Sequence, residues 1–245
     1  MLKFLSTDYF YQLEILAAIV ALITYKWYKN THNKYFLYFL WFTVIIETIG
    51  LITAINYFLP NSKIIHFFKD YFPETIVHEN DWLYNIYWLL FFPFYFLYFE
   101  KLIQNERTKK RVKILVVIYV LLSLLDLFLN FNQFNSTFLK LSRIVGTLSF
   151  LIIACSYLFE VIRNDEIFAF YLSLPFWITT GTMIFVLVTG PIYIFSDYTY
   201  ESNIMHHYFL KITDIGNYIL YGSFIVGFII NAYQEKKKLN EVNTD

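Results

Sequence analysis

The stretch YFLYFLWFTVIIETIGLITAINYF, from Tyr35 to Phe58, decides the fold class because it is long and apolar enough to cross a membrane. Its one acidic residue, Glu47, is twelve residues from Tyr35 and eleven from Phe58. At 1.5 Å per helical residue, Glu47 lies roughly 18 Å into the segment, near the middle of a bilayer. A charge at that depth costs on the order of 2.5 kcal/mol or more, so we expect Glu47 to face the protein interior and to have a partner there.

Six further segments of similar length predict an all-α polytopic membrane protein, a seven-helix transmembrane bundle folded as one domain over residues 1–245. Hydrophobic residues make up 58% of the chain and charged residues 16%, whereas a soluble domain typically has about 25% charged residues. The net charge of zero excludes a strongly basic nucleic-acid-binding protein. The expected spans are 10–27, 35–58, 82–100, 112–130, 141–162, 168–195 and 207–232.

The sequence also predicts the positions of two segments relative to the membrane. Residues 64–68, in the longest connection, predict a short helix that lies in the membrane interface. The aromatic residues of the span 82–100 are expected to face lipid and the interface, and Pro93 inside this span is tolerable because neighbouring helices can satisfy the freed carbonyl.

The distribution of basic residues predicts the orientation. If the N-terminus is outside, the inner segments hold 13 of the 19 Lys and Arg residues, mostly in the run 107–113 and the tail 236–238. The positive-inside rule therefore favours an N-out, C-in arrangement with seven spans. These basic inner loops would lie against anionic lipid or bind an acidic cytoplasmic partner protein.

Glu47 shares a helix face with Thr43, Gly50 and Ala54, at spacings of four, three and seven residues. Such small residues allow another helix to approach closely. Two interpretations stay open: a proton-binding or ligand-binding site in the bundle core, or a carboxyl group that fixes helix packing.

A second polar group is expected in the outer third of the bundle. It contains Glu14, Asp126 and Arg143, with Lys211 and Asp214 three residues apart on one helix face. With His206 and His207 these side chains can line a cavity that is open to the exterior and suited to a small polar ligand. The alternative is a rim of charges that pair with one another.

A third set of polar residues extends inward along the last span. Asp214, Asn217 and Tyr221 follow helical spacing, and Asn85 and Tyr84 of the third span can join them in one network. The alternative is that these side chains simply hold neighbouring helices together.

Signs of metal or nucleophilic chemistry are weak. His206 and His207 are adjacent, so they point about 100° apart and cannot chelate one ion from a single helix face. The sequence has no Gly-x-Ser-x-Gly elbow and no phosphate-binding loop. We therefore expect no metal and no cofactor, assign no catalytic residue, and consider an enzyme the least favoured class.

Five stretches resemble a family of small, uncharacterised seven-span integral membrane proteins of Bacteroidota. The resemblance runs the length of the chain and implies a seven-helix bundle in a bacterial inner membrane, without an activity or catalytic residues. The stretches are Glu14–Ile19, Phe39–Gly50, Trp82–Tyr87, Phe176–Ile192 and Gly216–Tyr221.

The leading functional hypothesis is a sensory or signalling membrane module. It would bind a ligand, lipid or partner between its helices and act through a separate cytoplasmic protein. The alternatives are a proton-coupled small-molecule transporter that uses Glu47, a homo-oligomeric pore or assembly subunit, and an intramembrane enzyme that acts on lipid. A seven-span layout alone does not choose among them.

Overall fold

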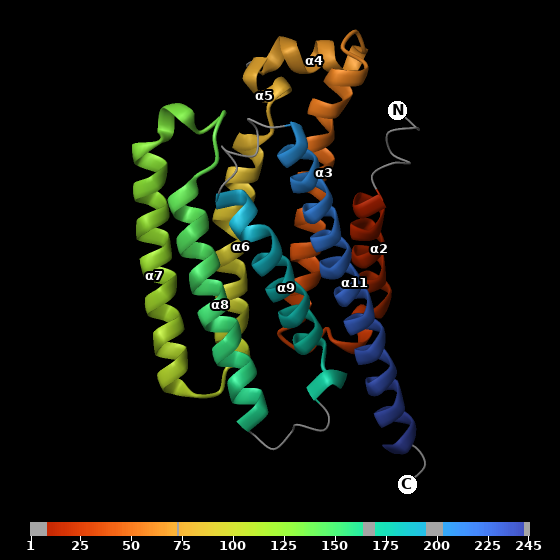
Figure 1. The fold of residues 1–245 in the computed structure, drawn as a ribbon. Helices are drawn as coiled ribbons and strands as arrows, with labels where there is room; N and C mark the ends of the chain where they lie inside the picture. Colours follow the sequence, from red (N-terminus) through yellow and green to blue (C-terminus); the bar gives the residue numbers. More distant parts are fainter. Residues whose placement is uncertain (1–8, 73, 164–169, 195–202, 243–245) are drawn as a thin grey trace.

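The chain folds as a bundle of long helices that run alternately up and down (Figure 1). This computed structural model describes residues 9–72, 74–163, 170–194 and 203–242, and the described residues contain no strand. The expected all-α fold is confirmed. The long helices are α2 (Tyr9–Thr24), α3 (Lys34–Phe58), α6 (Asp81–Leu102), α7 (Glu106–Leu129), α8 (Lys140–Arg163), α9 (Leu174–Ile194) and α11 (Asn203–Val242).

Six of these helices are long and apolar enough to cross a membrane: α3, α6, α7, α8, α9 and α11. The protein is therefore of the multi-pass membrane type by the length and composition of its helices. Helix α2 has 16 residues, fewer than the about 20 that a span needs, and the residues before Tyr9 lie outside the described part.

Two short helices cover one end of the bundle, α4 (Lys63–Tyr71) and α5 (Glu74–His78) (Figure 1). Ser62 caps α4 because its Oγ accepts a hydrogen bond from the Ile65 N–H at 3.3 Å. Ile64, Phe67 and Tyr71, three and four residues apart, all expose apolar surface, whereas Ile65 is buried. The expected helix at residues 64–68 is confirmed, and its exposed apolar face fits a position in the membrane interface.

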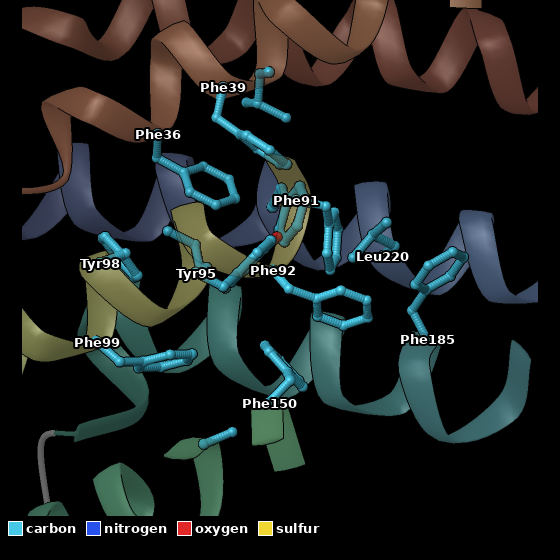
Figure 2. Close-up of a cluster of buried hydrophobic side chains, with 14 of the residues drawn as sticks. Phe36, Phe39, Phe91, Phe92, Tyr95, Tyr98, Phe99, Phe150, Phe185 and Leu220 are labelled. Carbon is cyan, nitrogen blue, oxygen red and sulfur yellow. The ribbon is translucent and has the colours of Figure 1, made fainter. Parts of the chain in front are cut away.

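The aromatic residues of α6 form the centre of the core, so the prediction that they face lipid is wrong. Trp88, Phe91, Phe92, Tyr95, Phe96, Tyr98 and Phe99 are all buried. Figure 2 shows several of these rings beside Phe36 and Phe39 of α3 and Phe150 of α8. The reason is that α6 lies against α3, α7 and α8. Lipid tails are as apolar as these side chains, so hydrophobicity alone does not tell a lipid-facing side from a core-facing one.

Helices α9 and α11 approach each other closely at glycines. A Cβ on Gly181 of α9 would lie 1.7 Å from the Ser223 Oγ of α11, and one on Gly227 of α11 would lie 2.6 Å from the Trp177 Cβ of α9. Only a glycine fits at each of these contacts. Gly181, in the expected span 168–195, therefore serves helix packing.

Three boundaries differ by six residues or more from the expected spans. Helix α7 begins at Glu106, six residues before the expected start at residue 112. Helix α9 begins at Leu174 and not near residue 168, and residues 164–169 lie outside the described part. Helix α11 continues to Val242, ten residues past the expected end. Its last turns are stabilised by ion pairs at helical spacing, Lys238–Glu235 at 2.7 Å and Lys237–Glu241 at 3.8 Å. Lys and Glu are good helix formers, so the charged tail prolongs the helix into water.

Candidate functional site

Glu47 lies where α3 packs against the start of α6. The Tyr84 hydroxyl donates a hydrogen bond to the Glu47 Oε2 at 3.1 Å. Next to it, the Asn80 Nδ2 donates to the Gly50 carbonyl at 3.0 Å, and a Cβ on Gly50 would lie 3.6 Å from the Tyr84 hydroxyl. The expected close approach of a second helix to this face is confirmed, and Tyr84 is the partner that a carboxyl at this depth requires.

Glu14 lies in the same region of the bundle, on α2. Its side chain is fully buried, and neither carboxyl oxygen has a hydrogen-bond partner among the described residues. The Tyr221 hydroxyl of α11 approaches this carboxyl, but the contact falls short of a well-formed hydrogen bond. The Glu47 carboxyl is close enough to interact with it electrostatically. Glu14 therefore joins Glu47 and not the expected outer group.

We call Glu14 and Glu47 the carboxylate pair. Besides Tyr84 and Tyr221, the phenol of Tyr87 interacts electrostatically with both carboxyl groups. Helices α2, α3, α6 and α11 thus each contribute a polar side chain to this region. Two ionised carboxylates at one site repel each other, and a bound proton or small cation relieves this repulsion.

Asp126 is the cap of a neighbouring helix. Its Oδ2 accepts hydrogen bonds from the backbone N–H of Ser142 at 2.7 Å and from the Ser142 hydroxyl at 2.9 Å. Its Oδ1 accepts from the Asn130 Nδ2 at 2.8 Å. Ser142 is the third residue of α8, whose first-turn N–H groups have no partner within the helix. An anion there is favoured by both hydrogen bonding and the helix dipole.

Asn85 holds the connection between α7 and α8. Its Nδ2 donates to the carbonyls of Phe134 and Thr137 at 2.9 and 2.8 Å, and its Oδ1 accepts from the Leu139 N–H at 3.0 Å. Both amide hydrogens and the carbonyl oxygen are thus engaged with backbone. This arrangement favours the packing interpretation of Asn85 over a ligand contact.

Arg143 is buried between two aromatic rings at the same end. The guanidinium carbon lies 4.8 Å from the centre of the Trp88 ring and 4.3 Å from that of Phe138. Both distances are within the range of cation–π attraction. A cavity of about 210 Å³ lies nearby, bordered by Asp126, Asn130 and Phe138 among others.

The expected residues of the last span are not gathered around Arg143. Lys211 is exposed, Asp214 and Asn217 are partly buried, and Lys211 and Asp214 form no ion pair with each other. The side chains of His206 and His207 lie outside the described part of the chain. The outer group is therefore divided: Asp126 and Arg143 lie on α7 and α8, and Lys211 and Asp214 lie on α11.

Glu160 was not expected from the sequence. It lies near the end of α8, and its Oε1 accepts hydrogen bonds from the backbone N–H groups of Gln104 and Asn105 at 2.6 and 3.0 Å. It thereby holds the connection that precedes α7 against α8, whereas the first-turn N–H groups of α7 itself are capped by the Asn105 Oδ1. Tyr87 was also missed, because one tyrosine among many aromatic residues gives no signal in the sequence.

No protein-family model matches the chain, and no curated protein or solved structure is significantly similar to it.

Proposed function

We propose that the chain is a seven-span sensory or signalling module of a bacterial inner membrane, with its N-terminus outside and its C-terminus inside. The orientation is supported by the charges at one end of the bundle. The connection between α6 and α7, the end of α8 and the end of α11 lie at this end (Figure 1). These segments include the basic run 107–113, Arg163 and the tail 236–238.

The carboxylate pair carries the functional proposal. Glu14 is an acidic residue with no exposed surface, no hydrogen-bond partner among the described residues and a second acidic residue as its neighbour. Such an arrangement destabilises the fold unless a proton or cation is present, and ionisable residues inside membranes commonly mark functional sites. We propose that occupancy of the carboxylate pair by a proton or small cation is the signal.

Helix α11 is the proposed output element. Tyr221 of this helix lies beside Glu14, and α11 packs along both α2 and α9. Its 40 residues extend about 60 Å, roughly twice the thickness of the hydrocarbon core. A change in the packing of Tyr221 against the pair would therefore move the basic end of α11, where an acidic cytoplasmic protein would bind.

Proton-coupled transport is the second candidate, because the same pair of carboxyl groups is suited to carry a proton. The two functions differ in proton flux. The full chain is reconstituted into liposomes that contain a pH-sensitive dye, and a pH gradient is imposed. If the protein is a sensor, the proton flux into these liposomes equals the leak into liposomes without protein. A flux that exceeds this leak and is abolished by Glu47→Gln, but not by Asp214→Asn, would replace the sensory proposal with a carrier.

A further inference from the structure

A groove of about 490 Å³ opens between α7 and α8, at the end of the bundle where α7 begins and α8 ends. Polar side chains border it from both helices, including Arg111 and Thr108 of α7 and Arg163 of α8. We call it the arginine groove. It is separate from the carboxylate pair, which involves α2, α3, α6 and α11.

The charge of the arginine groove suits an anion. Arg111 and Arg163 are exposed, and neither forms an ion pair with any residue that the structure describes. Glu160 also borders the groove, but its Oε1 already accepts the backbone N–H groups of Gln104 and Asn105. Within the described residues, both guanidinium groups are therefore open to a ligand, and guanidinium geometry matches the oxygens of a phosphate.

Exposed apolar side chains on α7 and α8, which we call the apolar stripe, continue from the arginine groove along both helices. On α7, Ile114 and Ile118 follow Arg111 at three and seven residues, and both are exposed. On α8, Phe159 borders the groove and is 67% exposed, and Ile152 precedes it by seven residues and is 56% exposed. A ligand with a phosphate at one end and a hydrocarbon chain at the other matches both parts.

We propose that the arginine groove binds an anionic phospholipid, with Arg111 and Arg163 on the headgroup phosphate and one acyl chain along the apolar stripe. Basic pockets between transmembrane helices are a known way to hold such headgroups. Thr108 and Asn105 also border the groove and can donate hydrogen bonds to further headgroup oxygens. The Asn105 Oδ1 caps α7, so the Nδ2 is the group of this side chain that can donate.

Native mass spectrometry of the full chain tests this site, with phosphatidylglycerol and phosphatidylcholine of identical acyl chains as probes. We expect the unmodified protein to retain phosphatidylglycerol preferentially. The double variant Arg111→Gln/Arg163→Gln should lose this retention by on the order of tenfold, since each basic residue near the headgroup contributes a severalfold effect. Arg163→Gln alone, at the exposed end of α8, should give a severalfold loss.

The matched control is Arg107→Gln/Lys110→Gln. It removes two positive charges from the first turns of α7, at positions that do not border the groove. We expect it to retain phosphatidylglycerol within about twofold of the unmodified protein, because its charges act only at a distance. An equal loss in both double variants would show diffuse attraction and overturn the proposal. So would displacement of phosphatidylglycerol by inorganic phosphate alone, because the groove would then be a site for free phosphate.

Discussion

At the scale of single residues, acidic side chains tie α7 and α8 together at both ends. Asp126 of α7 binds the first turn of α8, and Glu160 of α8 binds the connection that leads into α7. Asp126 accepts a buried N–H of the first helical turn, which would be costly to leave without a partner inside a membrane. Glu160 accepts exposed N–H groups and fixes the connection that leads into α7.

The hydrogen bonds of Asp126 to the first turn of α8 are expected to stabilise the fold. Asp126→Ala should lower the free energy of unfolding by about 2 kcal/mol, because it removes the cap and leaves the Ser142 N–H without its acceptor. Thermal or denaturant unfolding in detergent measures the change. Asp214→Ala is the control, since Asp214 accepts no backbone N–H among the residues that the structure describes, and it should shift stability by about 0.5 kcal/mol or less. Equal stability of Asp126→Ala and the unmodified protein would contradict the capping role.

The important polar residues could be recognised in the sequence, but most of their contacts could not. Glu47, Asp126 and Asn85 were all singled out, because a polar group in an apolar helix is costly without a partner. Apart from Asn130, which is four residues from Asp126, the partners of Asp126 and Asn85 lie between 16 and 54 residues away along the chain. Spacing within one helix cannot reveal contacts between helices. The placement of Glu14 beside Glu47 depends on how α2 packs and was missed for the same reason.

At the scale of helices, the contact between α9 and α11 depends on missing side chains. Gly181 and Gly227 come from opposite helices, and each would bring a Cβ into the partner helix. By contrast, a Cβ on Gly222 of α11 meets no atom within 4 Å. The same helix thus offers one crowded glycine and one open glycine for comparison.

Gly227→Ala should destabilise the protein by about 1–3 kcal/mol, because the added methyl group overlaps the Trp177 Cβ and forces α11 away from α9. Gly222→Ala should be neutral or stabilise by up to about 1 kcal/mol, since alanine favours a helix more than glycine does. Unfolding of the two variants under the same conditions measures the difference. A Gly227→Ala protein as stable as Gly222→Ala would show that the two helices do not pack as described.

The positions of the helices along the chain could be predicted from the sequence, whereas the side of each helix that faces the core could not. The apolar segments predicted most helix ends to within a few residues, because segment length and flanking charges are local properties. The exceptions were the early start of α7 at Glu106, the late start of α9 at Leu174 and the charged continuation of α11. The side of α6 that faces the core was predicted wrongly, because aromatic residues surround the helix and no continuous polar face marks the side that faces the protein.

At the scale of the whole molecule, the proposed orientation predicts which ends are accessible from each side. In a Cys155→Ser background, Lys237→Cys should react with a membrane-impermeant thiol reagent only after the cytoplasmic side is opened. Lys63→Cys, at the start of α4, should react from the outside in intact cells. Both positions are exposed in the structure. Reaction of both from the same side would contradict the N-out, C-in arrangement.

The measurement that tests the central claim most directly is the distance between two helix ends as a function of pH. Spin labels are placed at Lys237→Cys on α11 and Lys110→Cys on α7, in the Cys155→Ser background and in lipid nanodiscs. If the carboxylate pair controls α11, the distance distribution shifts between mildly acidic and mildly alkaline pH. Glu14→Gln and Glu47→Gln should abolish this shift, and Asp214→Asn should preserve it. A distribution that does not change with pH, or one that changes equally in the Glu14→Gln and Glu47→Gln proteins, would contradict the proposed coupling.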